Sequence, residues 1–511
     1  MTLLRPIMTV GSWTAVSRVL GFVRTVLVAN VLGVGIVADA FFIAFKVVIF
    51  LRALFSEGTL NSAFVPLFSR KLAKDGKQQA VLFAGEVIAV LGCVLVIICV
   101  VAELSMDWFI YIFAPGYSGS PEKIAMTVYL TRIVFPYFLF TVLAALMGGM
   151  LNSVDRFSAP AASPAILNVV LIFILLALSF GYFTYPGQVL AWGVTIAGFG
   201  QLIFIIIVCK QAGILVPLTR PRLSPDIKKL LQLIAPVLVG TSVVQINIVI
   251  DIILASTLQE GAISYLYYAD RIFQLPLATI GIAIGVSLLP VLTRQLESGD
   301  KSAVRSSQSR AIEYGLTVSL PSCLALLVIA DPIVLTLFQR GAFDLASVEA
   351  TANALSAYAV GLPAYILLRA LTPCFYARED TITPVKVAII MTVINVVIAI
   401  LLMQFFSYVG IALATAITSW FNAGTLFAIL THRGHLEIDD KLRQNIPRLI
   451  LSSVFMAGIL WWVYSMLTGN FMGGEMQRIV SLMTLICTGC ISYVLPAAGL
   501  GALRFSDMKI N

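Results

Sequence analysis

The chain has 511 residues, of which 60% are hydrophobic and only 11% are charged, and its mean hydropathy is +1.00. Soluble domains contain roughly 45 to 50% apolar and about 25% charged residues, so this composition excludes an ordinary soluble protein. The formal net charge of +8 is spread over segments between apolar runs instead of forming one basic patch. We therefore expect an integral membrane protein with no nucleic-acid partner.

Apolar runs long enough to cross a bilayer recur along the whole chain. A spanning helix needs about 20 mostly apolar residues, and about fourteen runs meet this requirement. In chain order they are 9–31, 38–60, 80–105, 126–150, 159–182, 187–209, 230–256, 262–290, 312–336, 350–373, 384–405, 409–431, 449–467 and 479–500. Runs of this length are typical of helices and too long for barrel strands, so the predicted fold is all-α and polytopic.

Lys and Arg are concentrated in alternate segments between these runs. With the N-terminus counted as cytoplasmic, about 23 of the 33 Lys and Arg fall in cytoplasmic segments, where the positive-inside rule expects them. The opposite segments hold only Lys123, Arg340 and Arg478. This distribution predicts that both termini face the cytoplasm, which requires an even number of spans.

The first twelve spans form two similar halves. The segment "FVPLFSR" at 64–70 returns as "LLPVLTR" at 288–294, and "NSVDRFSAP" at 152–160 matches "YAREDTITP" at 376–384 in position and polarity. Three pairs lie 224 residues apart: Pro66 with Pro290, Arg70 with Arg294, and Pro160 with Pro384. The alternative explanation is that helix ends resemble one another because proline and basic residues are common there.

A true repeat predicts a defined domain organisation. Because each unit holds six spans, an even number, both units cross the membrane in the same direction and form a parallel repeat. We expect two six-helix lobes, at 1–222 and 223–435, and two further helices within 436–511. In transporters built this way the substrate binds between the two halves.

Five cations lie deep inside predicted spans: Arg18 and Arg24 in the first, Lys46 and Arg52 in the second, and Arg271 in the eighth. Arg132 and Arg369 lie nearer span ends, where extension to the membrane surface is expected. An arginine at the centre of a spanning helix costs about 2.5 to 3.5 kcal/mol on insertion scales, so such residues almost always face a bundle interior or a water-filled cavity. Counted from the outward helix ends, two cationic levels are expected, roughly one and a half helical turns apart. Arg24, Lys46 and Arg271 form the outer level.

Three acids accompany these cations but leave a positive surplus. They are Asp39, Glu57 and Asp270. Asp39 precedes Lys46 by seven residues on one helical face, and we expect it to offset part of that charge. Glu57, which precedes Gly58, is equally suited to a helix break and to substrate contact. Since guanidinium groups match phosphate oxygens bidentately, the surplus predicts a phosphate-bearing substrate. The alternative is that the cations extend to lipid headgroups or form internal ion pairs.

Six segments, taken together in this order, resemble the lipid II flippase family, MurJ or MviN, of the multidrug/oligosaccharidyl-lipid/polysaccharide exporter superfamily. They are "SRVLGFVR" at 17–24, "ADAFFIAFK" at 38–46, "LFSEGTLNSAFVPLFS" at 54–69, "APGY" at 114–117, "LNSVDRFSAPA" at 151–161 and "YYADRIFQLP" at 267–276. The resemblance covers essentially the whole chain. It implies a fourteen-helix protein with two lobes around a central cavity, which moves the undecaprenyl-pyrophosphate-linked peptidoglycan precursor, lipid II, from the inner to the outer leaflet.

The resemblance also implies roles for individual residues. By similarity, Arg18, Arg24, Arg52 and Arg271 match cavity arginines that bind the pyrophosphate and headgroup, with Asp39, Lys46 and Glu57 at matching functional positions; we add Asp270 to the substrate-binding set. The last two helices match a groove for the lipid tail. Many family members carry two arginines where this chain has Arg52 followed by Ala53, so the number of cytoplasmic-side cations does not carry over.

We therefore expect a transporter of the bacterial inner membrane that works by alternating access, as a monomer, and is not an enzyme. Its expected partners are lipid II, membrane lipids and cell-wall synthesis proteins. The sequence contains no G-x-x-x-x-G-K-[ST] loop, which nucleotide hydrolysis of the P-loop type requires, so no cofactor is expected. An ion gradient, the membrane potential or downstream consumption of substrate would supply energy, and the coupling ion, Na⁺ or H⁺, stays open.

Other functions would require a different set of residues or a different substrate. A flippase for another lipid-linked oligosaccharide, such as O-antigen or capsule, would share the cationic cavity, whereas a drug or cation antiporter of the same superfamily would need an acidic one. A membrane glycosyltransferase or phosphatase would need positioned acids, histidines or a metal site. The only histidines, His432 and His435, lie in one loop, which disfavours such an enzyme.

Overall fold

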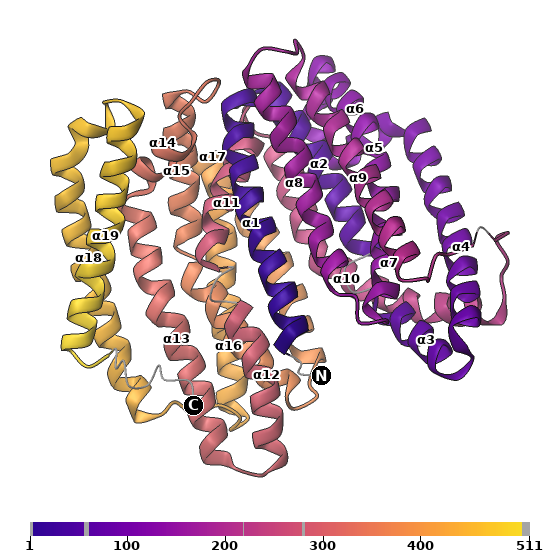
Figure 1. The fold of residues 1–511 in the computed structure, drawn as a ribbon. Helices are drawn as coiled ribbons and strands as arrows, with labels where there is room; N and C mark the ends of the chain where they lie inside the picture. The colour runs from indigo at the N-terminus through magenta and orange to yellow at the C-terminus, as the bar shows by residue number, and fades with distance from the viewer. Residues whose placement is uncertain (1–3, 56–60, 218, 278–281, 503–511) are drawn as a thin grey trace. The chain divides into compact units, whose positions relative to one another are not determined.

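A computed structural model of the chain shows a fold built from helices (Figure 1). The structure describes residues 4–55, 61–217, 219–277 and 282–502. Within these ranges there is no strand. The prediction of an all-α fold is confirmed.

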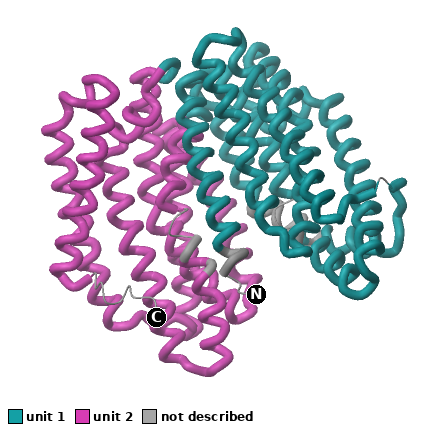
Figure 2. The backbone as a smooth tube through the Cα atoms, in the orientation of Figure 1, with its two compact units in different colours: residues 1–264, 341–343 teal, residues 265–340, 344–511 magenta. Residues whose placement is uncertain are grey.

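Packing divides the chain into two compact units (Figure 2). The first comprises residues 1–264 with 341–343, and the second comprises 265–340 with 344–511. The first unit therefore includes a long helix that the repeat assigns to the second lobe, and a short loop from later in the sequence. The lobes at 1–222 and 223–435 are defined by the repeat and not by packing, and they stay a prediction.

The first unit is a bundle of long apolar helices. Prolines begin α6, α7, α9 and α10, where a missing N–H costs nothing because the first turn has no intrahelical acceptor for it. In this unit α1 packs along α8, α9 packs against α7 and α8, and α2 packs against α6 and α10. The helices are α1 (Leu4–Leu32), α2 (Ile36–Phe55), α3 (Asn61–Lys74), α4 (Gly76–Leu104), α5 (Met106–Phe113), the short η2 (Pro115–Gly119), α6 (Pro121–Val134), α7 (Pro136–Asn152), α8 (Ser158–Ser179), α9 (Pro186–Gln211) and α10 (Pro225–Ser256).

The second unit contains most of the remaining helices, and α11 begins in the first unit and continues here. Helix α13 packs against α16 and α18, α16 packs against α17, and α18 and α19 form an antiparallel pair (Figure 1). The helices are α11 (Ala262–Pro276), α12 (Ile282–Glu297), α13 (Lys301–Val328), α14 (Ala330–Phe338), α15 (Leu345–Ala359), α16 (Leu362–Tyr376), α17 (Ile382–His432), α18 (Asp440–Phe471) and α19 (Glu475–Gly499).

Helix α17 is two spans joined at a sharp reversal. Ser407, inside its 51 residues, has φ 50° and ψ −134°, outside the helical region. A Cβ on Gly410 would collide with the backbone of Leu402, so glycine permits the close approach of the two arms. The predicted spans 384–405 and 409–431 leave the same three residues between them, and this prediction is confirmed.

The order of helices repeats along the chain. Helices α5 and α14 begin at residues 106 and 330, α6 and α15 at 121 and 345, and α8 and α17 at 158 and 382, each pair 224 residues apart. Packing partners recur as well: α3 with α4 and α12 with α13, α4 with α7 and α13 with α16, and α7 with α9 and α16 with α17. The order and the packing partners of the helices therefore repeat with a period of 224 residues, and α2 and α11 hold equivalent positions in this order. That the two repeats cross the membrane in the same direction stays a prediction.

Ten helices among the described residues are long and apolar enough to cross a membrane. One of them, Ile382–His432, contains two of the predicted spans. Helix α2 carries Asp39, Lys46 and Arg52 within 20 residues, and α11 has only 15 residues, so neither belongs to this most apolar set. Two of the three helices with predicted site cations, α2 and α11, therefore lie outside this set, whereas α1, which carries Arg18 and Arg24, belongs to it.

Candidate functional site

Arg24 on α1 is buried and its guanidinium group contacts α2. The residue is 8% exposed, and its Cζ lies 5.4 Å from the centre of the Phe45 ring. A cation over an aromatic face is favourable, more so where water is excluded. Because Lys46 follows Phe45 directly, this contact sets Arg24 beside the turn of α2 that carries Lys46, which agrees with the equal depth predicted for the two cations.

Helix α1 contacts α8 through Ser17 and Gly21, which lie close to Arg18 in the sequence. The Asn168 side chain of α8 donates to the carbonyl of Ser17 at 2.8 Å, and a Cβ on Gly21 would lie within 4 Å of the same Asn168. Arg18 itself is exposed, whereas Lys46 and Arg52 on α2 are half-buried. An exposed arginine on a spanning helix needs water or lipid headgroups around it, so the exposure of Arg18 agrees both with a cavity and with extension to headgroups.

Asp39, on the first turns of α2, caps the N-terminus of α11. Its carboxylate accepts hydrogen bonds from the backbone N–H groups of Gly261 (2.7 Å) and Ser264 (2.9 Å) and from the Ser264 hydroxyl (2.6 Å). The residue is only 2% exposed. The first N–H groups of a helix have no intrahelical acceptor, and the positive end of the helix dipole favours an anion there. The three hydrogen bonds go to the start of α11, and the expectation that Asp39 offsets part of the charge of Lys46 stays a prediction.

The capping is reciprocal. Glu260, just before α11, accepts a hydrogen bond from the first N–H of α2, that of Ile36, at 3.1 Å. The other oxygen of Glu260 lies 3.7 Å from the Lys123 ammonium group, near the start of α6. Ile36 and Glu260 are 224 residues apart, the period of the repeat. We call Ile36, Asp39, Glu260, Gly261 and Ser264 the reciprocal cap.

Two loops fasten the adjoining helix ends. Ala342, in the loop after α14, donates from its N–H to the Asn30 carbonyl at 2.9 Å, and Gly33, with φ +57°, ends α1 where a Cβ would collide with that loop. Gly116, in the loop after α5, donates from its N–H to the Ser256 hydroxyl at 3.2 Å, at the end of α10. The two loops hold equivalent places in the repeat, so α1 and α10 are fixed by matching contacts.

Of the reciprocal cap only Asp39 was predicted as a site residue, and the two loops were not predicted. Backbone N–H donors such as those of Gly261 and Ser264 carry no local signal in a sequence, because every residue except proline has such a group. One signal was present: Glu260 is an acid immediately before a predicted span, at the position that the repeat pairs with the start of α2.

The remaining predicted residues lie in the second unit or outside the described residues. Arg271 on α11 has its Cζ 4.9 Å from the Tyr267 ring one turn earlier, and Asp270 accepts a hydrogen bond from the Gln274 side chain at 2.6 Å. Glu57 lies outside the described residues. That Arg271 and Asp270 bind the same substrate as the cations of the first unit stays a prediction.

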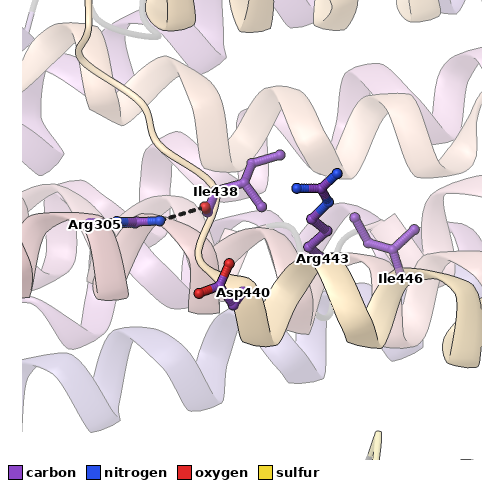
Figure 3. Close-up of a pocket in the computed structure, with 5 residues that line it drawn as sticks. All are labelled: Arg305, Ile438, Asp440, Arg443 and Ile446. Carbon is purple, nitrogen blue, oxygen red and sulfur yellow. Dashed lines mark hydrogen bonds between the residues drawn. The ribbon is translucent and has the colours of Figure 1, made fainter.

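A pocket in the second unit lies away from these residues. It has a volume of about 570 Å³ and is lined by Arg305, Ile438, Asp440, Arg443 and Ile446 (Figure 3). Arg305 is partly held, because it donates to the Ile438 carbonyl at 3.0 Å and lies 3.4 Å from Glu437. The pocket sits where α13 meets the start of α18 and contains none of the predicted substrate-binding residues.

The chain was compared with known families and structures. The family model "Lipid II flippase MurJ" matches residues 28–482. A probable lipid II flippase MurJ from Rhizobium meliloti (strain 1021) is 40% identical over 519 residues, covering 100% of this chain and 96% of the relative. A solved structure of lipid II flippase MurJ in an inward closed conformation superposes with a TM-score of 0.77 at 26% identity, covering 96% of this chain and 99% of that one.

A more distant structure extends the likeness of fold. An inward-facing multidrug resistance transporter of the MATE family, in the MOP superfamily, superposes with a TM-score of 0.70 at 15% identity, covering 82% of this chain and 94% of that one. At this identity the likeness concerns the fold alone. The family model and the relative match most or all of the sequence, and the resemblance seen in its motifs is confirmed: the chain belongs to the lipid II flippase MurJ family.

Proposed function

We propose that this membrane protein translocates lipid II, the undecaprenyl-pyrophosphate-linked peptidoglycan precursor, from the inner to the outer leaflet by alternating access. The observation that carries the proposal is full-length membership of the MurJ family together with cations held inside apolar helices. A transporter of this kind performs no covalent chemistry. It needs a polar site for the headgroup and a barrier that opens on one side at a time.

The substrate site is proposed to consist of Arg18, Arg24, Lys46, Arg52 and Arg271, with Asp39, Asp270 and Glu57 as the acids nearby. Arg24 supports this role because it is charged and buried in an apolar helix, with its guanidinium group against the Phe45 ring. Its planar guanidinium suits bidentate binding of phosphate oxygens. In surroundings of low polarity such charge-assisted hydrogen bonds are roughly twice as strong as neutral ones.

The reciprocal cap is proposed as the barrier on the outward side. The residues of the cap adjoin segments that are poor in Lys and Arg, including that of Lys123, and these are outward in the proposed orientation. Loss of a side-chain cap costs about 0.5 to 2 kcal/mol, so two caps and two loop contacts can hold the outward side closed by a few kcal/mol. A ligand with a comparable difference in affinity between two states can shift such an equilibrium.

The C-terminal helices are proposed to hold the lipid tail. Helices α18 and α19, within 436–511, pack against each other and against α13 and α14. Large apolar side chains of α18 remain exposed in the described structure, among them Leu451, Phe455, Trp461 and Trp462. An apolar surface of this kind suits a polyprenyl chain. The lobes 1–222 and 223–435 would then carry the headgroup site.

The test of the proposed activity is transport by the purified protein. Proteoliposomes with labelled lipid II in both leaflets are treated with a membrane-impermeant reagent that destroys only the exposed label. We expect the protected fraction to fall when the protein is present and to stay near one half in empty liposomes. A lipid-linked O-antigen precursor is measured in parallel. Equal protection with and without protein would contradict the proposal, and movement of the O-antigen lipid alone would assign the other substrate.

The second prediction concerns orientation in the inner membrane, for which the distribution of Lys and Arg is the support. In a variant without the native cysteines, a single cysteine is introduced at Lys74 or at Glu122, both exposed. We expect the Lys74→Cys protein to react with a membrane-impermeant thiol reagent only after the cells are opened, and the Glu122→Cys protein to react in intact cells. The reverse pattern would overturn the proposed topology of both termini.

We further propose that the protein acts as a monomer near cell-wall synthesis proteins. The support is that each chain contains both repeats and so carries a complete set of the proposed substrate-binding residues.

A further inference from the structure

A second pocket lies in the first unit, where α3 and α4 meet the segment that joins α9 to α10. Its volume is about 390 Å³. The lining residues used below are Lys71 of α3, Leu82 and Glu86 of α4, Arg220 and Arg222 of the connecting segment, and Asp226 of α10. None of them belongs to the proposed substrate site.

The acids of this pocket already have partners. Asp226 lies 2.7 Å from the Lys71 ammonium group, and Glu86 accepts a hydrogen bond from the Ser224 hydroxyl at 2.7 Å. Arg220 and Arg222 are exposed, and among the described residues neither side chain has a hydrogen bond or ion pair. The lining therefore contains three cations and two carboxylates, and two guanidinium groups are available for a ligand.

The pocket lies at the end of a spanning helix. It extends over the first turns of α4, which is one of the helices long and apolar enough to cross a membrane. Leu82 on this stretch is 45% exposed although it lines the same pocket as the arginines. A ligand that fills the pocket therefore meets cationic and apolar groups together, as it would at the boundary between headgroups and acyl chains.

We propose that this pocket binds the phosphodiester headgroup of an anionic phospholipid, with Arg220 and Arg222 on the phosphate and Leu82 along the acyl chain. Basic pockets between helices on the cytoplasmic side are suited to such headgroups. The surplus of one positive charge matches one phosphodiester anion, whereas a polyanion such as a nucleotide would also meet the carboxylates of Glu86 and Asp226. The bound lipid would tie the segment between the repeats to α3 and α4. The choice of leaflet rests on the proposed orientation, and the site does not depend on the transported substrate.

The experiment measures lipid binding, not transport. The purified, delipidated full-length protein is titrated with phosphatidylglycerol, phosphatidylcholine and inorganic phosphate, and bound lipid is counted by native mass spectrometry. Removing an arginine near an anionic lipid is expected to weaken binding about fivefold, so the Arg220→Gln/Arg222→Gln protein should bind phosphatidylglycerol about 25-fold more weakly than the unmodified protein. Phosphatidylcholine should bind weakly to both.

The matched control is Lys228→Gln/Lys229→Gln, which removes the same charge from exposed positions on α10 outside this lining. It should retain phosphatidylglycerol within about twofold, since neither lysine lines the pocket and exposed charges without direct contact contribute little. Equal weakening in both double variants would overturn the proposal, because it would indicate attraction to general positive charge.

A third variant separates a lipid from a free phosphate. Leu82→Gln leaves every charge in place, so it should weaken phosphatidylglycerol binding and leave phosphate binding unchanged. If millimolar phosphate displaces the lipid and Leu82→Gln has no effect, the pocket is a free-phosphate site and the lipid proposal is wrong. If the double arginine variant does not fold, Arg222→Gln alone and Leu82→Gln still decide between these outcomes.

Discussion

The Asp39→Ala protein is expected to lose the closed state of the outward barrier. The substitution removes three hydrogen bonds at once and leaves the N–H groups of Gly261 and Ser264 without their acceptor in a buried place. An unsatisfied buried donor costs about 1 to 3 kcal/mol. For two such groups a loss of about 2 to 4 kcal/mol is reasonable, which corresponds to roughly a 30- to 1000-fold change in the equilibrium between closed and open caps.

Hydrogen exchange at the cap measures this change directly. In the unmodified protein the N–H groups of Ile36, Gly261 and Ser264 are bonded to the two carboxylates and should exchange slowly. In Asp39→Ala all three should exchange faster, including that of Ile36, since the caps are expected to open together. If Ile36 kept its protection while Gly261 and Ser264 lost theirs, the two caps would be independent and the barrier hypothesis would fail.

Two further variants test whether the faster hydrogen exchange is caused by opening of the outward barrier. Asp300→Ala removes a cap within one helix, where Asp300 accepts from the N–H of Ala303 at 2.9 Å at the start of α13; it should raise exchange only there. Glu260→Gln keeps an oxygen for the Ile36 N–H but loses the charge that faces Lys123. Because the Glu260 side chain is 47% exposed, we expect Glu260→Gln to destabilise the closed cap less than Asp39→Ala does. The loss should lie within the 0 to about 1 kcal/mol of an exposed ion pair.

The sequence predicted features that depend on composition and counting. The break near Ser407 falls between the predicted runs 384–405 and 409–431, each of which has about the 20 residues that one spanning helix needs. The prediction that Arg24 and Lys46 lie at the same depth came from counting residues from the helix ends, since a helix rises by a fixed amount per residue. Both inferences use geometry that is the same for all helices, and so they require no knowledge of tertiary contacts.

The same geometry cannot predict contacts between residues that are far apart in the sequence. Asp39 was predicted to lie on the face of α2 that carries Lys46, but the partners of its three hydrogen bonds lie 222 and 225 residues away, and two of the three donors are backbone groups. The position of Arg271 relative to Arg24 likewise depends on how the two units are arranged. Local sequence patterns do not encode such distances, and the assignment of one shared substrate site still needs a direct test.

That test is the effect of the cations on substrate binding and transport. Arg24→Ala should reduce lipid II binding about 10- to 150-fold, because a hydrogen bond to a charged group contributes about 1.5 to 3 kcal/mol, and transport should fall with it. The Arg24→Lys protein should bind lipid II more weakly than the unmodified protein and more tightly than Arg24→Ala, since lysine keeps the charge but lacks the planar guanidinium group. Binding is measured by titration of the purified protein with lipid II, and transport by the proteoliposome assay.

Arg132→Ala is the matched control for loss of an arginine from a spanning helix of the same unit. Its side chain is 45% exposed and faces Glu103 and Asp107 at 3.9 and 3.4 Å, as expected for a residue that extends to the membrane surface. This variant should transport normally. If Arg24→Ala transported as well as Arg132→Ala at the same protein level, Arg24 would have no part in the substrate site.

A double-mutant cycle tests whether Arg24 and Arg271 bind one pyrophosphate. Effects of independent sites add within about 0.3 to 0.5 kcal/mol, whereas groups that act on a shared partner deviate from additivity by about 0.5 to 3 kcal/mol. We expect Arg24→Ala/Arg271→Ala to lose less binding free energy than the sum of the single losses, because the second arginine acts on an anion already displaced by loss of the first. Strict additivity would mean that the two cations bind different parts of the substrate, and the outer cationic level would then not be a single anion site.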